Sequence, residues 1–270
     1  MGQTGAMMVT ADVALPAAAM VGAARALGIL SIFPIFSLFN IAGILRFGLA
    51  IGLSGPAVSF AFSVLTKGQT SYFDLGALSL KEFCVGALVG AGLGLPFWAA
   101  QAAGDMTDVY RGANAANLFD QVNALETTPL GQILLSAALM LFVAGGGVVD
   151  LVAIFYRSFT FWPLLVMQPA FPGDGLAIIL DLFALLFRLG AVLASPFIIL
   201  TCVLELSIAF VSRSARQFSV NDSLATFKNL AVFLILIVYV VFIASYMKEA
   251  WQAGFADIRA IFDTVLHGQE

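Results

Sequence analysis

The chain has 270 residues, of which 61% are hydrophobic and only 10% are charged, and its mean hydropathy is +1.02. An ordinary soluble domain is about 45–50% apolar and about 25% charged, so a water-soluble globule of this size cannot hide so much apolar surface. The formal net charge of −4 is spread thinly and forms no basic stripe, which leaves nucleic-acid binding without a basis. We therefore expect an all-α integral membrane protein whose apolar surface is covered by lipid or by protein partners.

Apolar stretches of about 20 residues, the length that crosses the hydrocarbon core, recur along the chain. In chain order they cover residues 26–45, 47–66, 83–104, 130–149, 175–212 and 229–247. Residues 248–270 form a mildly amphipathic tail, and residues 1–16 lack the basic n-region of a cleaved signal peptide, so we expect mature protein from Met1. Because no polar linker divides the chain, we predict one membrane domain over residues 1–270 with a polar loop at about 105–128.

Charged residues inside or beside the apolar stretches are predicted to be buried where helices pack. They are Arg25, Arg46, Asp150, Asp181, Arg188 and Glu205. A charge that faces lipid at mid-membrane costs at least about 2.5–3.5 kcal/mol, so such residues usually face protein or water.

Prolines interrupt the same stretches, and each removes a backbone hydrogen bond and can kink or break a helix. They are Pro34, Pro56, Pro96, Pro163 and Pro196. Broken helices are tolerated in a membrane only where neighbours or a water-filled cavity satisfy the freed groups. The pattern predicts kinked hydrophobic helical hairpins that pack tightly against other subunits.

Glycine recurs at every fourth residue in two places, so one face of each helix carries only hydrogen atoms where side chains would stand. The two sets are Gly86, Gly90 and Gly94, and Gly48 with Gly52. Faces of small residues let helix backbones approach closely, so both sets predict tight helix packing. A run of three glycines at 145–147 predicts a bend or a very close contact.

A short string resembles that of a rhomboid-type protease but lacks its catalytic partner. Gly52-Leu53-Ser54-Gly55 fits the G-x-S-G string, whose serine needs a base such as histidine within hydrogen-bond reach. The only histidine of the chain, His267, lies outside every apolar stretch. The two cysteines, Cys84 and Cys202, are isolated in apolar runs, so we expect no metal site and no cofactor.

A second string resembles that of intramembrane aspartyl proteases. Gly104-Asp105, with Asp108 nearby, is similar to the G-x-G-D string, but Ala102 stands where the first glycine belongs. The sequence also has no Walker A loop and no H-E-x-x-H string. We therefore expect a protein that is not an enzyme.

An ordered set of motifs resembles one known family over about residues 25–246. In the middle of the chain the matching residues are Gly104, Asp108, Arg111-Gly112, Asp120, Pro129-Leu130-Gly131, the glycines at 145–147, Ser158 and Trp162-Pro163. On either side the matching residues are Arg25, Gly28, Pro34, Arg46, Pro56, Pro196, Glu205, Arg213, Ala215, Gln217, Val220 and Lys228. This set is similar to the SctT/FliR family of type III export apparatus proteins.

The match has departures, one of which separates two branches of the family. The flagellar branch usually carries an N-G-H string where this chain has the three glycines at 145–147, which favours the virulence or symbiosis type. Gln121, Arg216 and Thr226 replace prolines of the family pattern, and Ser219 replaces an asparagine.

The resemblance implies a T subunit of an export gate at the bacterial inner membrane, raised toward the periplasm at the base of the secretion needle complex. Its implied partners are the R-type and S-type subunits, the U-type switch subunit, membrane lipid and unfolded secreted proteins in transit through the gate. The polar loop would then be a plug, and we expect residues 111–124 to line or block the pore. The candidate pore residues are Arg111, Asn114, Asn117, Leu118, Phe119 and Asp120.

Two other classes of function stay open at this point. A stand-alone solute transporter or channel explains hydrophobicity, broken helices and buried charges equally well. The sequence shows no convincing internal repeat, which weakens that alternative. An intramembrane enzyme is the third class, and its activity would depend on Ser54 or Asp105.

Overall fold

The computed structural model describes residues 13–39, 41, 43–67, 71–111, 128–167, 175–214 and 220–267, and every regular element in these ranges is a helix. The helices are α1 (Ala14–Ile32), α2 (Pro34–Leu38), α3 (Gly43–Leu53), α4 (Gly55–Leu65), α5 (Tyr72–Arg111), α6 (Pro129–Ala144), α7 (Gly147–Phe161), α8 (Gly175–Ser214) and α9 (Val220–His267). Within the described residues, four helices are long and apolar enough to cross a membrane, or up to six spans if each bent helix pair counts as one. The predicted all-α membrane fold is confirmed.

The chain divides into two compact units. The first comprises Met1–Gly94, Val148–Ile178 and Gly254–Glu270, and the second comprises Leu95–Gly147 and Ile179–Ala253. The single membrane domain over residues 1–270 stays a prediction.

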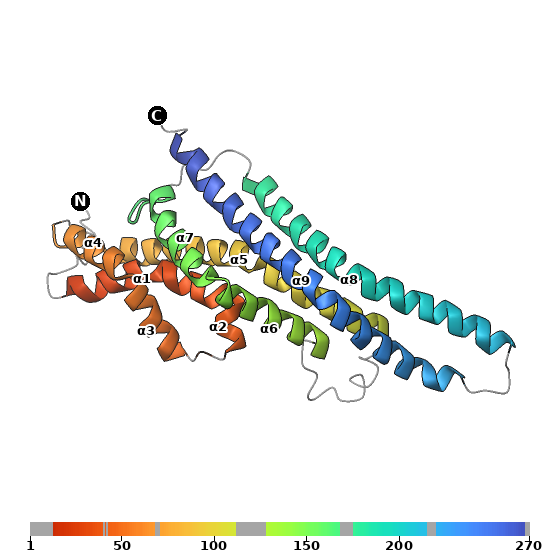
Figure 1. Ribbon diagram of the computed structural model, residues 1–270. Helices are drawn as coiled ribbons and strands as arrows, with labels where there is room; N and C mark the ends of the chain where they lie inside the picture. The colour runs from red at the N-terminus through yellow and green to blue at the C-terminus, as the bar shows by residue number, and fades with distance from the viewer. Residues whose placement is uncertain are drawn as a thin grey trace, which may run out of the picture. The chain divides into compact units, whose positions relative to one another are not determined.

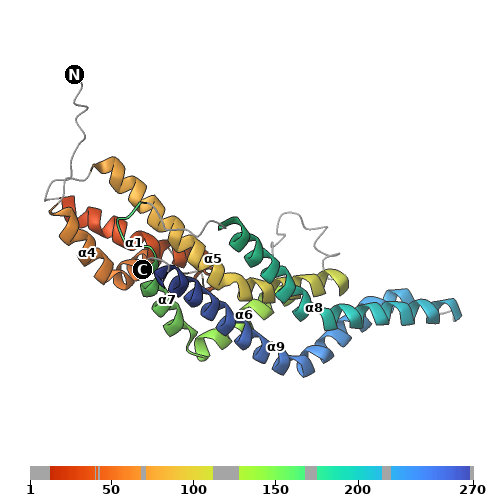
Figure 2. The same ribbon diagram turned by 90° about the horizontal axis from the view of Figure 1, so that it is seen from above.

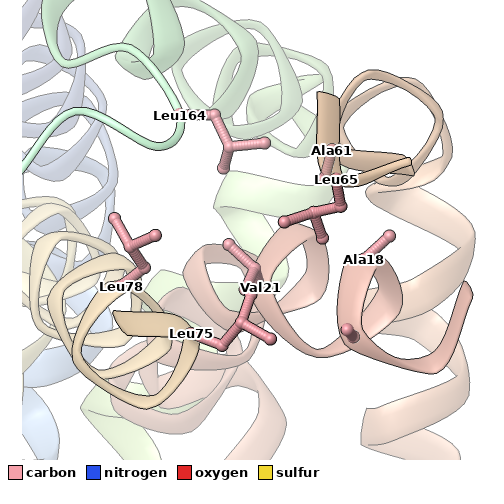
Figure 3. Close-up of a cluster of buried hydrophobic side chains, with 8 residues drawn as sticks. Ala18, Val21, Ala61, Leu65, Leu75, Leu78 and Leu164 are labelled. Carbon is pink, nitrogen blue, oxygen red and sulfur yellow. The ribbon is translucent and has the colours of Figure 1, made fainter. Parts of the chain in front are cut away.

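In the first unit, α1 packs against α3 and α4, and α1 and α4 lie side by side in both Figure 1 and Figure 2. A hydrophobic cluster joins these helices to the start of α5 and to the segment after α7. Figure 3 shows its side chains gathered together. Its buried members are Ala17, Ala18, Val21, Ala61, Leu65, Leu75, Leu78 and Leu164. Ala17, Ala18 and Val21 of this cluster belong to α1, which is the most buried of the span-length helices, with 61% of its span inside the protein.

Glycines bring α1 and α5 into backbone contact in the same unit. A Cβ at Gly86 would overlap the carbonyl oxygen of Arg25, and a Cβ at Gly28 would overlap that of Phe83. A Cβ at Gly90 would lie 3.0 Å from the Cα of Ile29. The tight packing predicted for Gly86 and Gly90 is therefore present, because their missing side chains let two backbones meet.

The prolines act in two different ways. Pro34 is the first residue of α2 and Pro56 lies in the first turn of α4, where a missing N–H costs no helical hydrogen bond. Pro96 and Pro196 lie inside the continuous helices α5 and α8. Pro163 follows α7. Of these prolines, Pro34 and Pro56 thus lie where a new helix begins, whereas Pro96 and Pro196 do not interrupt the helices that contain them.

The carbonyl group that Pro196 leaves without its helical donor has a replacement donor. Ser195 donates its hydroxyl proton to the carbonyl oxygen of Val192 at 2.8 Å. Val192 is four residues before Pro196, so this is the carbonyl whose usual N–H donor the proline lacks. Neighbouring Ser and Thr side chains commonly compensate prolines in membrane helices in this way.

The expected bend at the glycine run is confirmed. Helix α6 ends at Ala144, α7 begins at Gly147, and Gly146 between them has a φ of +80°, a backbone conformation that favours glycine. Other boundaries differ from the apolar runs, because α1 begins at Ala14 rather than at residue 26 and α9 continues through the tail to His267. Tertiary contacts and helix propensity extend these helices beyond the charged residues that bounded the apolar runs.

The second unit contains the remaining helix pairs. The Phe142 ring of α6 makes edge-on contacts with Phe97 of α5, at a centroid distance of 5.1 Å, and with Trp251 of α9, at 5.9 Å. Within this unit α8 and α9 run side by side, as both Figure 1 and Figure 2 show. The rings of Phe197 and Tyr239 meet across that pair at 5.5 Å. These aromatic contacts link α6 to α5 and α9, and α8 to α9.

Candidate functional site

The two helices that flank residues 112–127 are joined by buried and partly buried hydrogen bonds. Helix α5 ends at Arg111 and α6 begins at Pro129. The Asp105 carboxylate accepts hydrogen bonds from the backbone N–H of Thr128 at 3.1 Å and from its hydroxyl at 2.7 Å. The Asp108 carboxylate accepts from the backbone N–H of Leu130 at 2.9 Å. We call these four residues, Asp105, Asp108, Thr128 and Leu130, the loop-base clamp.

The clamp also supplies hydrogen-bond acceptors for the backbone N–H groups at the start of α6. The first N–H groups of a helix have no partner inside the helix, and carboxylates near them are favoured by the helix dipole. Thr128 is the N-cap residue, and its hydroxyl accepts from the N–H of Gly131 at 3.2 Å, while Pro129 has no N–H to satisfy. Side chains of α5 therefore complete the capping of α6.

Two glycines make this approach possible. A Cβ at Gly104 would lie 2.5 Å from the backbone nitrogen and Cα of Gly131, closer than real side chains come. A Cβ at Gly131 would overlap the Asp105 carboxylate. The carboxylates reach the α6 backbone because neither glycine has a side chain in the way.

The end of α5 is also held from the α8–α9 pair. The Lys228 ammonium donates a hydrogen bond to the carbonyl oxygen of Tyr110 at 3.4 Å and forms an ion pair with Glu205. Tyr110 is one residue from the end of α5, where carbonyl groups lack helical donors and a cation is favoured by the dipole. The end of α5 is thus bonded to Lys228 of α9, which also pairs with Glu205 of α8, as well as to α6.

A second polar cluster, the Arg25 network, lies fully buried in the first unit. The Arg25 guanidinium donates to Glu82 at 2.7 Å, to the Ser158 hydroxyl at 3.1 Å and to the Trp162 carbonyl at 2.8 Å. The central carbon of the guanidinium, Cζ, lies 4.2 Å from the centroid of the Phe159 ring.

The Glu82 carboxylate of the network has a second cationic partner. It forms an ion pair with Lys81, whose ammonium also donates to the Val166 carbonyl at 3.1 Å. The network joins α1, α5, α7 and the segment after α7, and satisfied groups of this kind act as structural links.

The other predicted buried charges have different surroundings in the single chain. Arg46 is partly buried, and its Nε has no hydrogen-bond partner in the described part of the chain. Asp150 is partly buried, Arg188 is exposed, and Glu205 is about half exposed although it pairs with Lys228. The side chain of Asp181 lies outside the described residues. Packing of these charges against other subunits stays a prediction.

Most of the candidate pore residues lie outside the described ranges. Arg111 is the last residue of α5, and its side chain is not among those described. The others, Asn114, Asn117, Leu118, Phe119 and Asp120, fall within residues 112–127. The structure therefore describes the end of α5 and the start of α6, which flank these residues in the sequence.

The residues of the protease-like strings have structural surroundings. Ser54 is buried at the corner between α3 and α4, where the Tyr156 hydroxyl donates to the Leu53 carbonyl at 2.7 Å. Asp105 and Asp108 cap α6. These contacts explain Asp105 and Asp108 as parts of a helix junction, whereas the buried Ser54 hydroxyl has no hydrogen-bond partner among the described residues.

Sequence reasoning missed two parts of these sites, Glu82 and Thr128. Glu82 directly precedes the predicted apolar stretch 83–104, and the sequence indicated no further role for it. Thr128 followed by Pro129 is a recognisable helix start, with an N-cap hydroxyl and proline in the first turn.

Comparison with known proteins identifies the family. Residues 17–254 match the family of bacterial export proteins, family 1. The chain belongs to this family. The match includes both the loop-base clamp and the Arg25 network. Family membership and the span-length apolar helices together indicate an inner-membrane protein of the export apparatus.

Individual relatives confirm the predicted branch. The chain is 29% identical over 182 residues to Yop proteins translocation protein T of Yersinia pestis, which covers 67% of this chain and 70% of the relative. It is 30% identical over 186 residues to surface presentation of antigens protein SpaR of Shigella sonnei, with 66% and 70% covered. The flagellar biosynthetic protein FliR of Escherichia coli is 25% identical over 199 residues, with 73% and 74% covered. The type III secretion T proteins are thus nearer relatives than the flagellar protein.

Proposed function

We propose that the chain is a structural and channel-forming subunit of a type III secretion export gate, which helps to conduct unfolded proteins across the inner membrane. The observation that supports this most directly is the loop-base clamp. Its hydrogen bonds, together with Lys228, tie the end of α5 to the start of α6 and to α9 in the second unit. The names of the relatives, which describe protein translocation and secretion, agree with a role in export.

A channel plug must be long enough to obstruct the pore and must be attached so that it stays at the pore. Residues 112–127 join two helices whose ends are fixed by a carboxylate on each of two successive turns of α5. We propose that residues 111–124, through Arg111, Asn114, Asn117, Leu118, Phe119 and Asp120, line or block the pore. The clamp keeps the end of α5 and the start of α6 in position, while substrates displace the segment between them.

The proposed partners are R-type and S-type subunits and the U-type switch subunit, in an assembly raised toward the periplasm. In the second unit, only 22% of the α8 span and 17% of the α9 span are buried within the chain. The exposed Arg188 lies on the α8 span, where lipid contact would be costly. Protein neighbours account for both features. A chain that is recovered alone although these subunits are present, and that conducts solute by itself, would favour a stand-alone transporter.

Deleting residues 111–124 is expected to increase the leakage of ions and small solutes through the assembled gate. The reason is that the deletion removes the proposed plug while it takes only the last residue, Arg111, from α5 and none from α6. The measurement is solute uptake by cells that express the complete gate, with the intact chain as reference. A glycine-serine segment of equal length in place of 111–124 is expected to leak as well, and permeability equal to that of the intact gate would contradict the plug.

Substitution of the clamp is expected to loosen the plug without removing it. Asp108→Ala leaves the buried N–H of Leu130 without its acceptor, at a cost of about 1–3 kcal/mol in the free energy of unfolding. We expect leakage between that of the intact gate and that of the deletion, and a smaller effect for Asp108→Asn, which keeps an acceptor oxygen. Asp74→Ala, at an exposed position in the first turn of α5, is the matched control. Identical permeability for Asp108→Ala and Asp74→Ala would rule out a role for the clamp in closing the gate.

A further inference from the structure

We propose that α8 docks, on the face that carries Arg188, a helix of a neighbouring gate subunit, and that a carboxylate of this helix forms an ion pair with Arg188. This inference rests on the proposed function, because it names a surface through which the chain would join its assembly and the chemistry of the partner at that surface. The evidence is the side of α8 on which Arg188 lies, its lack of a partner in the chain, and the length of the apolar helix around it.

Arg188 lies on the side of α8 opposite to the side that packs within the second unit. The packed side holds the buried Gly190, where an added Cβ would lie 3.5 Å from the carbonyl oxygen of Ala99 in α5. Phe197, seven residues after Gly190 and therefore on the same side, meets the Tyr239 ring of α9. Successive helical residues are about 100° apart, so Arg188 lies about 160° around the helix from Gly190. Arg188 is exposed, so its own chain leaves this side uncovered.

The residues that share this side with Arg188 are apolar and exposed. Val192, Ile199 and Leu206 follow Arg188 at i+4, i+11 and i+18, which places them on one side of the helix. Their exposed fractions are 38%, 63% and 62%. We call these four residues, Arg188, Val192, Ile199 and Leu206, the Arg188 face. A single charge within an apolar surface sets the chemistry of what covers it, because a charge that loses its hydration there needs an opposite charge.

The chain offers Arg188 no such charge among the residues that the structure describes. Arg188 forms no hydrogen bond or ion pair with them. On α8 itself, Asp181 is seven residues away, about 10 Å along the helix axis, and Glu205 is 17 residues away, about 25 Å. Glu205 is in addition paired with Lys228. The carboxylate that pairs with Arg188 therefore has to come from another molecule.

The length of α8 favours protein over lipid as the cover of the Arg188 face. Its 40 residues extend about 60 Å, twice the hydrocarbon thickness of about 30 Å. Even a tilt of about 40°, the upper end of the usual range, leaves about 46 Å along the membrane normal. Residues 175–212 nevertheless carry only three charged residues, so the apolar surface of α8 is longer than lipid can cover. Protein has to cover the remainder.

The position of the bilayer along α8 does not remove this need. Where the Arg188 face lies in the hydrocarbon core, a charge faces lipid, and where it lies outside, apolar side chains face water. A lipid phosphate reaches Arg188 only if the mostly apolar residues 175–187 lie outside the core. A protein helix with a carboxylate satisfies both the apolar side chains and the guanidinium, whose planar donors fit the two carboxylate oxygens.

The first measurement is photo-crosslinking from position 192, one turn from Arg188, in the full-length chain expressed with its neighbouring export genes and extracted as the intact complex. We expect an adduct with a helix of another gate subunit, and mass spectrometry is expected to find an Asp or Glu within about one turn of the crosslinked residue. Adducts with lipid only, with a second copy of this chain, or with a segment that has no acidic residue would overturn the proposal.

The second measurement compares variants by the amount of partner recovered with the tagged chain. Arg188→Glu is expected to recover about tenfold less partner, because two carboxylates would face each other. The change breaks no contact among the described residues, and Arg in place of the crosslinked acidic residue of the partner is expected to restore recovery. Lys248→Glu, the same charge reversal at an exposed position of α9 in the same unit, is the matched control.

The outcomes separate this inference from the proposed function. If the intact chain recovers gate subunits and Arg188→Glu recovers as much as Lys248→Glu, the docking role of the Arg188 face is wrong and gate membership stands. A loss that the reversed partner charge does not restore would also overturn the ion pair. If the intact chain recovers no gate subunit, the proposed function itself fails.

Discussion

Replacing Arg25 by methionine is expected to lower the free energy of unfolding by about 3–5 kcal/mol, the usual cost of breaking a buried ion pair. Arg25 and Glu82 are both completely buried, and the guanidinium also satisfies the Ser158 hydroxyl and the Trp162 carbonyl. Methionine replaces the aliphatic stem of Arg25, so the loss mainly reflects the missing charge and hydrogen bonds of the guanidinium. The measurement is unfolding of the purified protein in mixed micelles.

A second substitution at Glu82 separates the cost of an unpaired charge from the worth of the pair. Removing both charges with Arg25→Met and Glu82→Met is expected to recover about half of the lost stability or more, because no buried carboxylate is left with a missing partner. Lys81 keeps its hydrogen bond to the Val166 carbonyl in the double variant. Arg25→Lys is the control for charge alone, and we expect an intermediate loss because lysine lacks the planar fork. This account is contradicted if the double variant loses as much stability as the two single variants, Arg25→Met and Glu82→Met, lose in sum.

The helices and their membrane character could be predicted from the sequence, because apolar composition and run length are local properties. The effect of each proline could not. Pro34 and Pro56 lie where new helices begin, whereas Pro96 and Pro196 lie within unbroken helices. At Pro196 the difference depends on Ser195, which supplies the hydrogen bond that the proline removes.

The start of the polar loop shows how tertiary contacts override local polarity. Asp105 and Asp108 mark the beginning of a polar stretch, which predicts a loop, yet α5 continues to Arg111. Their carboxylates are stable on that helix because the first turn of α6 supplies backbone donors. The clamp joins residues more than 20 positions apart, and the sequence carries no pattern that pairs them.

The same limit applies to charge. The apolar surroundings of Arg25 predict that it is buried, but its partner Glu82 is 57 residues away and could not be paired with it by spacing. Glycine spacing has the complementary limit. It shows that a helix face carries no side chains, but it does not show whether another helix of the chain packs on that face, as at Gly86, or leaves it open, as at Gly48.

That distinction leads to the second large expected effect. Gly86→Ala is expected to lower the free energy of unfolding by at least about 3 kcal/mol, the upper end of the usual cost of overpacking. The added methyl group would overlap the carbonyl oxygen of Arg25, which is backbone and cannot rotate away as a side chain can. Separating α1 from α5 at this point would also displace Arg25 from Glu82, so the steric and electrostatic losses occur together.

Gly76→Ala in the same helix provides a control with the opposite expected sign. No atom lies within 4 Å of a Cβ at Gly76, so alanine there is expected to stabilise the protein by about 0.5–1 kcal/mol through the lower backbone entropy of the unfolded chain. Both variants carry the same chemical change on α5 and are measured by unfolding in mixed micelles. Equal effects of the two substitutions would show that helix propensity, rather than contact with α1, sets the requirement for glycine. A loss confined to Gly86→Ala would show that the α1–α5 contact depends on the absence of a single methyl group.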